Sequence, residues 1–538
     1  MTAEAPKTQS GLTHYDAVIV GGGFAGLHSL HKLRGQGMTA RVFEAGDGVG
    51  GTWFWNRYPG ARVDIQSLEY SFQFDDKLQQ EWEWSEKYAP QPELLKYANH
   101  VADRFNLWPD IQLNTRVAGA RWDEGAKRWR VETDKGEAVT ANHLIMATGC
   151  LSATNMPDIP GLKDFKGRMF HTGQWPKEGA DFTGRRVGII GTGSSAIQTI
   201  PIVAKQAASL TVFQRTANYS VPAHNGPIPD EVVRDVKSRY SEYRQANYAT
   251  PFGAAFGYRE EGALEVSEAE RIAEYERRWA RGGLNFYGAF TDLVISAEAN
   301  KTAADFIRGK IRQIVKDPAV AELLCPDSPV GCKRMCVDTG YYDTYNQPHV
   351  KLVDIRSAPI ETVTASGLRT ADANYEFDDL ILATGFDAMT GALTRMDIRG
   401  VGGVSLKDYW SEGPKNYLGL CVAGFPNMFI IAGPGSPSVL TNMLPSIEQH
   451  VNWIGDALAD FRDKGVTRME ATPKAQEDWV GHVNEIADAT ILPGCNSWYL
   501  GANIPGKPRV FMPYLGLPPY IDKCNDVVAK GYEGFVLA

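Results

Sequence analysis

The sequence predicts an α/β fold with two Rossmann-like domains, because one strand–glycine turn–helix–strand pattern occurs twice in the chain. The first copy spans residues 15–44 and the second spans residues 186–214. Units of this kind build parallel sheets. From about residue 225 to 330 the chain is instead rich in charged residues and helix formers, so we expect a helical insertion in the second domain, with Ser267 and Glu270 as a capping box. A long amphipathic helix is expected from about Pro445 to Lys464.

The composition is that of a large globular protein. Of 538 residues, 22% are charged and 43% are hydrophobic, so a large core can form without metals or disulfides. With 55 Lys and Arg against 64 Asp and Glu, the net charge of −9 argues against a nucleic-acid partner. The chain shows neither a signal peptide pattern near its N-terminus nor an apolar run that could span a membrane. We therefore expect a cytoplasmic protein.

The seven cysteines predict neither disulfides nor a metal site. Their number is odd and no two are spaced C-x-x-C. Without histidines at ligand spacing, a zinc site is not expected either. We predict free thiols in a reducing compartment, at Cys150, Cys325, Cys332, Cys336, Cys421, Cys495 and Cys524.

The first glycine turn has every feature of a dinucleotide site. Gly21-x-Gly23-x-x-Gly26 follows the strand at residues 15–20 and opens a helix. These glycines permit a tight turn and a close approach of the pyrophosphate, which the helix N-terminus faces. Glu44 ends the next strand, 18 residues after Gly26, where a carboxylate accepts ribose hydroxyl hydrogen bonds.

The second turn, Gly191-x-Gly193-x-x-Ala196, predicts a different nucleotide. The strand after it ends at Gln214 and continues with Arg215 and Thr216, without the acidic residue typical of an NAD site. A guanidinium suits a phosphate group, and the threonine adds a hydroxyl donor. Two such sites in one chain predict a tightly held FAD in the first, reduced by exchangeable NADPH in the second.

Two longer motifs indicate what the reduced flavin does. Residues 50–64 match [AG]GxWxxxx[FY]P[GM]xxxD, which ends at Asp64. Residues 165–176 match FxGxxxHxxxWP through Phe165, Gly167, His171, Trp175 and Pro176. From about residue 14 onward, the chain resembles the type I, single-chain Baeyer–Villiger monooxygenases, which use FAD and NADPH. Near residues 436–442 and 496–507 it looks closest to the steroid and phenylacetone monooxygenase branch.

The resemblance implies a reaction and a catalytic pair. NADPH reduces FAD, oxygen forms a flavin peroxide, and the peroxide attacks a ketone to give an ester or lactone. Arg334, in the segment Lys333-Arg334, matches the family's catalytic arginine, and Asp64 matches its partner. A permanent cation stabilises the peroxide and the tetrahedral intermediate without titrating. The alternatives are a flavin monooxygenase that hydroxylates N or S atoms, and a non-catalytic FAD/NADP sensor.

The resemblance also assigns binding residues. It implies a conformational or positioning role for His171, and a substrate pocket at Ser438, Val439 and Leu440. The residues expected at FAD are Gly21, Gly23, Gly26, Glu44, Thr52, Trp53, Asp64, Tyr70, Val117 and Met443. Those expected at NADP are Thr192, Gly193, Ser194, Ser195, Ala196, Gln198, Arg215, Thr216, Lys333, Arg334 and Trp498, the last on a mobile loop at about residues 484–516. For Trp498 an ordinary buried position in the core is an equal alternative.

We expect residues 1–150 and 386–538 to form the FAD domain. Residues 151–385 then form the NADP domain, with its helical insertion at about 225–330. The expected partners are a small-molecule ketone and O2, with no nucleic acid or membrane, and we expect a monomer.

Overall fold

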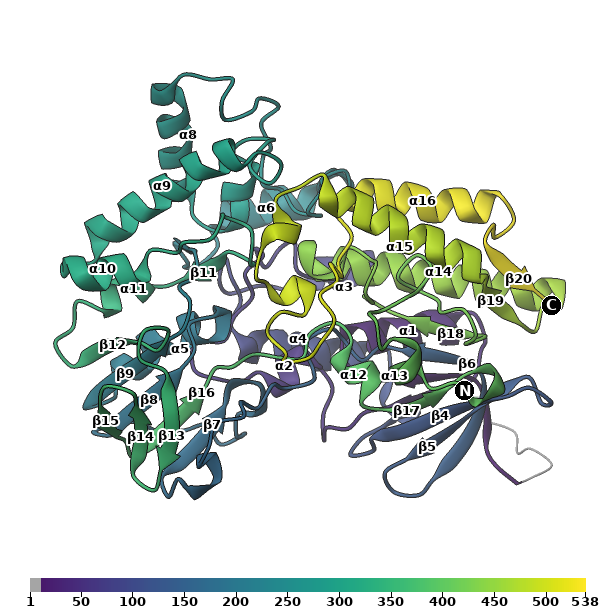
Figure 1. Cartoon of the computed structure of the whole chain (residues 1–538). Coiled ribbons are helices and arrows are strands. Elements are labelled where there is room, and N and C mark those ends of the chain that lie inside the picture. The colour runs from purple at the N-terminus through teal and green to yellow at the C-terminus, as the bar shows by residue number, and fades with distance from the viewer. Residues whose placement is uncertain (1–10) are drawn as a thin grey trace.

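The computed structural model describes residues 11–538, and Figure 1 shows two large sheets, with smaller sheets and helices packed around them. Residues 1–10, part of the segment in which no signal peptide pattern was found, lie outside the described residues. The predicted α/β class with two Rossmann-like units and a helical insertion is confirmed.

The first sheet has eight strands and lies at the lower right of Figure 1. Strand β1 runs parallel to both β2 and β6, so that Ile19 stands beside Val42 on one side and Ile145 on the other. Two late strands join this sheet, β17 beside β4 and β18 beside β6. Its strands are β1 (His14–Val20), β2 (Ala40–Phe43), β3 (Ile111–Gln112), β4 (Val117–Asp123), β5 (Arg128–Thr133), β6 (Ala138–Met146), β17 (Asp397–Arg399) and β18 (Met428–Ile430).

The second sheet has five strands in the order β12-β9-β8-β16-β7, and every pair is parallel. This order places the predicted strands 186–190 and 210–214 side by side. The strands are β7 (Arg168–His171), β8 (Arg186–Ile190), β9 (Ser209–Gln214), β12 (Val350–Asp354) and β16 (Asp379–Leu382).

One helix follows each glycine turn. In the first turn, a Cβ atom on Gly26 would collide with the carbonyl oxygen of Gly21, so only glycine lets α1 (Phe24–Gly35) pack this close to β1. In the second turn, α5 (Ser194–Ala204) begins after Gly193. Both helix N-termini therefore face the carboxyl ends of the parallel strands, where α/β proteins bind nucleotides.

The insertion lies above the second sheet, at the upper left of Figure 1. Ser267 caps α8 as expected, but the carboxylate of Glu270 pairs with Arg259 instead of returning to the cap. The helices of the insertion are α6 (Asp230–Ser238), α7 (Tyr240–Tyr248), α8 (Glu268–Arg281), α9 (Ala297–Ile314) and α10 (Pro318–Leu324).

The C-terminal part of the chain adds long helices beside the first sheet. The helix expected from about Pro445 begins earlier, at Met443, because the Asn442 side chain accepts the backbone N–H of Leu444 (3.3 Å). These helices are α14 (Met443–Lys464), α15 (Pro473–Asp488) and α16 (Leu517–Ala529). Within the described part of the chain, no helix is long and apolar enough to cross a bilayer.

One apolar core is shared by the two sheets. Buried Ile19 and Ile145 of the first sheet belong to the same cluster as Ile189 and Val212 of the second. The apolar interiors of the two Rossmann-like units are therefore continuous.

Candidate active site

Arg334 lies between two segments that are distant in the sequence. It precedes β11 (Cys336–Asp338), and its guanidinium donates two hydrogen bonds to Asp64, from Nε to Oδ2 (2.6 Å) and from Nη2 to Oδ1 (3.0 Å). A third bond runs from Nη1 to the carbonyl oxygen of Val439 (2.7 Å). Burial by itself would lower the pKa of Arg334, but the Asp64 carboxylate outweighs burial and raises it. The arginine is therefore a permanent cation with a fixed direction.

Aromatic side chains surround this cation. The Arg334 guanidinium carbon lies 5.9 Å from the ring centroid of Phe252. The hydroxyl of Tyr287 accepts the backbone N–H of Met335 (3.0 Å), and burial raises the pKa of Tyr287 to about 12. Tyr499 is 2% exposed, and burial raises its pKa as well. Both phenols therefore stay protonated at neutral pH. They add no negative charge that would compete with Asp64 for Arg334.

The predicted FAD turn is built around Glu44. The Glu44 carboxylate is buried and accepts two backbone N–H groups, from Gly22 (2.6 Å) and Gly46 (2.7 Å). Glu44 thus orders the glycine turn itself, a role that the sequence did not reveal. Gly51 faces Gly23 so closely that a Cβ on Gly51 would lie 2.9 Å from the Gly23 Cα. Because neither glycine has a side chain, the two backbone segments form an open cradle, which fits a dinucleotide.

The other predicted FAD residues follow this cradle. Thr52 begins α2 (Thr52–Trp55), and the next residue, Trp53, donates from Nε1 to the hydroxyl of Tyr70 (3.2 Å). Their rings meet edge to face, with centroids 5.9 Å apart. Val117 is the buried first residue of β4, and Met443 is the half-buried first residue of α14.

The second turn is tied to its surroundings by hydroxyl and amide groups. Thr192 donates to the carbonyl oxygen of Thr216 (3.0 Å), and Ser195 lies 3.2 Å from the Thr172 hydroxyl. Ser194 lies 3.2 Å from the Cys336 sulfur, while Ala196 is buried inside α5.

Gln198 joins this turn to the motif at residues 50–64. Its Oε1 accepts the Tyr58 hydroxyl (2.9 Å), and its Nε2 donates to the Arg62 carbonyl oxygen (3.1 Å). A Cβ on Gly60 would collide with the Gln198 carbonyl oxygen. The glycine of that motif therefore lets the two Rossmann-like units come into contact.

Two cations lie close together beside the second turn. Arg215 is exposed and Lys333 is half-buried; burial first, and then the positive charge of Arg215, lower the pKa of Lys333. Among residues 11–538, no carboxylate reaches either side chain within 4.0 Å, although Asp327 attracts Lys333 from farther away. Two cations without a salt bridge suit an anionic ligand such as a phosphate.

The predicted substrate loop contacts the predicted cation. Residues Ser438–Leu440 form the short helix η6, in which the φ angle of Ser438 is +40° and its hydroxyl donates to the Ala432 carbonyl oxygen (3.0 Å). The loop joins an apolar cluster that the sequence did not predict. Its other buried members are Cys150, Ala388, Met389, Ala487, Leu492, Tyr499, Leu500, Phe511 and Met512.

His171 lies where the chain passes between the two sheets. Its Nδ1 accepts the backbone N–H of Gly173 (3.0 Å), and its Nε2 lies 3.3 Å from the Thr384 hydroxyl and 3.4 Å from the Asn155 carbonyl oxygen. Asn155 and Gly385 are themselves hydrogen-bonded through their backbones (2.9 Å). The histidine thus contacts both connections between the units.

The other residues of the motif at residues 165–176 make close packing contacts on both sides of β7. A Cβ on Gly167 would lie 2.5 Å from the ring of Phe165, which is buried. Trp175, followed by Pro176, stacks on Phe170 with centroids 5.0 Å apart.

The prediction that all cysteines are free is wrong. Cys332 and Cys495 form a disulfide, with Cα atoms 5.5 Å apart. Sequence spacing could not reveal it, because 163 positions separate the two residues and only the fold brings them together. In the described part of the chain the other five remain free: Cys150, Cys325, Cys336, Cys421 and Cys524.

The segment of residues 489–516, between α15 and α16, passes between the two halves of the molecule as the yellow loop near the centre of Figure 1. It carries Trp498, which is half-buried with its ring 4.4 Å from that of Tyr499. Asn503 donates to the Phe386 carbonyl oxygen (2.7 Å), and Lys507 pairs with Asp387 (2.7 Å). The segment therefore touches the connection between the two sheets.

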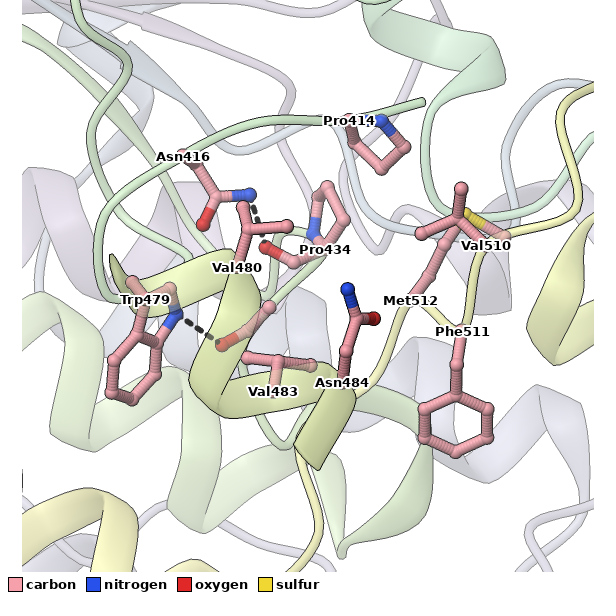
Figure 2. A pocket seen from close by; sticks show the side chains of 11 residues that line it. Pro414, Asn416, Pro434, Trp479, Val480, Val483, Asn484, Val510, Phe511 and Met512 are labelled. Atoms are coloured by element: carbon pink, nitrogen blue, oxygen red, sulfur yellow. Dashed lines mark hydrogen bonds between the residues drawn. The ribbon is translucent and has the colours of Figure 1, made fainter. Parts of the chain in front are cut away.

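Figure 2 shows a small cavity behind the loop that leads to η6. Asn416 donates to the Pro434 carbonyl oxygen (2.6 Å), and Trp479 donates to that of Gly435 (3.1 Å). The free volume is about 20 Å³, enough for roughly one water molecule. This cavity is too small for a ketone, so it is not the substrate site.

Comparison with known proteins identifies the family. The family model of pyridine nucleotide-disulphide oxidoreductases matches residues 18–252. The chain is 44% identical to a Baeyer-Villiger monooxygenase from Pseudooceanicola batsensis, over 100% of this chain and 98% of that protein. It is 42% identical to a phenazine N-monooxygenase from Lysobacter antibioticus, over 98% and 97% of the two chains.

A solved structure gives the same answer. An oxidised steroid monooxygenase bound to NADP matches with a TM-score of 0.94 and 51% identity, covering 98% of this chain and 99% of that one. The resemblance seen in the motifs is thereby confirmed, and the chain belongs to the Baeyer–Villiger monooxygenases, flavin-dependent enzymes that use NADPH and O2 to turn ketones into esters or lactones.

Proposed function

We propose that this chain oxidises a ketone to an ester or lactone with Arg334 as its catalytic cation. The observation that carries the proposal is the triple hydrogen bonding of one guanidinium to Asp64 and to the backbone of Val439. The carboxylate fixes the direction of the guanidinium, and the Val439 carbonyl brings it to the substrate loop. A cation aimed in advance stabilises developing negative charge at little reorganisation cost.

FAD binds at the first turn and NADPH at the second. The glycine cradle of Gly23 and Gly51 fits a pyrophosphate, and the unpaired Arg215 and Lys333 fit the phosphate that distinguishes NADPH from NADH. When bound, FAD supplies the redox chemistry that activates O2. The chain's own residues hold the cofactors, exclude water and hold a positive charge at Arg334.

The substrate is an apolar ketone. Val439 and Leu440 belong to the cluster that also holds Met389 and Met512, and methionines adapt to substrates of different shapes. Its similarity to a steroid monooxygenase supports a bulky ketone within this class.

We also propose how the chain is divided into two domains. Residues 1–150 and 386–538 form the FAD domain, and residues 151–385 form the NADP domain. We further propose a cytoplasmic monomer. Gel filtration of the FAD-loaded protein at two concentrations tests the monomeric state.

A second candidate function is oxygenation of a nitrogen atom, which the similarity to a phenazine N-monooxygenase favours. A nitrogen nucleophile attacks the activated oxygen directly and forms no tetrahedral adduct from a carbonyl group. N-oxygenation therefore depends less on the Arg334 cation than ester formation does.

One experiment separates these functions. The FAD-loaded protein receives NADPH, O2 and a panel of linear, cyclic, aryl and steroid ketones, with a phenazine in parallel. We expect esters or lactones from at least one bulky ketone. Hydrogen peroxide as the sole product with every ketone, together with a phenazine N-oxide, would favour the second function.

A further inference from the structure

The disulfide joins two segments that both carry proposed active-site residues. Cys332 directly precedes Lys333 and Arg334, while Cys495 lies three residues before Trp498. The bond therefore ties the segment of residues 489–516 to the residues proposed to hold the NADP phosphate and the reacting atoms. Nothing in the chemistry of ketone oxidation requires a disulfide at this place.

Few polar contacts hold that end of the segment besides the disulfide. One backbone hydrogen bond connects it to the insertion, from Ile491 to the Val294 carbonyl oxygen (3.0 Å). Among residues 11–538, the other hydrogen bonds of the segment to distant parts of the chain lie beyond Trp498. Asn503 and Lys507 reach the connection between the sheets, and Met512 and Tyr514 pair with the backbone of Gly435 and Ser436. Hydrogen bonds exchange readily with water, so beside the apolar packing of Leu492, Tyr499 and Leu500 the covalent bond is the strongest restraint on the position of Trp498.

We propose that Cys332 and Cys495 form a redox-controlled latch over the NADP site. In the oxidised state the disulfide holds residues 489–516 against the Lys333–Arg334 segment and slows exchange of the nicotinamide nucleotide. In the reduced state the segment keeps its apolar packing but opens more often, and the nucleotide exchanges more quickly. This inference rests on the proposed NADPH site at Arg215 and Lys333.

Hydrogen peroxide is the oxidant that closes the latch. The first thiolate attacks the O–O bond, which breaks to give a sulfenic acid and one water after proton transfer. The second thiol attacks the sulfenic sulfur, so the S–S bond forms and a second water leaves. Two thiols thus lose two electrons and two protons, and the peroxide is reduced to two waters.

The proposed activity supplies this oxidant, because NADPH oxidation that does not oxygenate a ketone reduces O2 to hydrogen peroxide. The two sulfur-bearing residues are only 2% and 8% exposed, so a small oxidant reaches them best. A dithiol reverses the reaction by thiol–disulfide exchange. The latch would then close when ketone is scarce and peroxide accumulates.

The test compares the two redox states of the FAD-loaded enzyme. One sample is reduced with dithiothreitol and desalted without oxygen; the other is treated with hydrogen peroxide and then catalase. Alkylation after unfolding should label all seven cysteines of the reduced form but five of the oxidised form. Hydrogen exchange of residues 489–516 and stopped-flow association of NADP+ are then measured in both forms.

We expect hydrogen exchange of residues 489–516 and association of NADP+ to be about tenfold slower in the oxidised form, because the disulfide raises the free energy of opening the segment. Cys495→Ser should show the fast values in both samples. The matched control is Cys325→Ser, which removes a half-buried free thiol and should behave like the wild type.

Two results would overturn the latch: seven labelled cysteines after peroxide treatment, or equal NADP+ association rates in the two forms. A segment whose hydrogen exchange depends on redox state, in a protein that binds no NADP+ in either state, would instead contradict the proposed cofactor site. That result would still show that the disulfide restrains the segment.

Discussion

Asp64 and Arg334 stand 270 positions apart in the sequence, yet two parallel hydrogen bonds of 2.6 and 3.0 Å join them. The side chain of Arg334 is 16% exposed and that of Asp64 is 28% exposed, so water screens the pair only in part. A two-point contact fixes the plane of the guanidinium as well as its position. The third bond, to Val439, uses a donor that Asp64 leaves free.

Replacing Arg334 should separate oxygenation from cofactor binding. Arg334→Ala should retain FAD and oxidise NADPH to give hydrogen peroxide, while ester formation falls by about 100-fold or more, the usual loss when a preorganised charge stabiliser is removed. Gas chromatography of the product and the visible spectrum of the flavin measure the two properties. Arg334→Lys keeps the charge but loses the planar fork, so we expect an intermediate rate. Ester formation at the wild-type rate by the alanine variant would contradict the proposed role.

Replacing Arg215 should change the choice of nucleotide. Arg215→Ala removes a charge-assisted hydrogen bond, which is worth about 1.5–3 kcal/mol, so the KM for NADPH should rise roughly 10- to 100-fold. The KM for NADH should hardly move. The matched control is Arg369→Ala. It removes an exposed arginine that pairs with Glu361 and also lies within residues 151–385. Equal increases for both nucleotides would argue that Arg215 does not contact the distinguishing phosphate.

The two nucleotide turns could be predicted because their signals are local. Strand, glycines, helix and strand follow within 30 residues. Gly21, Gly26 and Gly191 meet steric needs that the structure shows, since a Cβ on any of them would collide with a backbone carbonyl oxygen. The helix boundary at Met443 was less predictable, since the capping residue Asn442 stands three positions before Pro445, where the helix was expected to begin.

Contacts between distant residues could not be predicted from the chain alone. The Cys332–Cys495 bond and the Tyr58–Gln198 hydrogen bond depend on how the two sheets pack. Glu44 was expected at a ribose, yet both of its oxygens already accept backbone N–H groups. Its sequence position indicated the site but not the partners, because a buried carboxylate first satisfies the nearest donors.

Shortening Leu440 should shift substrate choice. Leu440→Ala removes three carbon atoms from the apolar cluster, and discrimination of this kind is worth about 1–3 kcal/mol. The ratio of kcat/KM for a bulky aryl ketone over a small cyclic ketone should therefore rise about tenfold or more. Leu323→Ala, on the surface of α10, is the control and should leave the ratio unchanged. An unchanged ratio in Leu440→Ala would place the substrate elsewhere.

A buried acid in α14 should make stability depend on pH. Glu448 is 1% exposed; its Oε1 accepts the backbone N–H groups of Gln73 (2.8 Å) and Phe74 (3.1 Å), and its Oε2 has no hydrogen-bond partner. Burial raises its pKa from 4.5 to about 7. The folded protein thus binds this proton more tightly than the unfolded chain does. The free energy of unfolding should therefore fall as the pH rises from about 4.5 to about 7.

Glu448→Gln should remove this dependence, because the amide keeps the acceptor oxygen and has no carboxyl proton to lose. Relative to the wild type, the variant should gain up to about 3 kcal/mol in the free energy of unfolding between acid and mildly alkaline pH. Urea unfolding of the FAD-loaded protein at about pH 5 and about pH 8 measures the gain. Glu477→Gln, on the exposed face of α15, is the control and should show no such gain. If Glu448→Gln differs from the wild type by the same amount at both pH values, folding does not raise the pKa of Glu448.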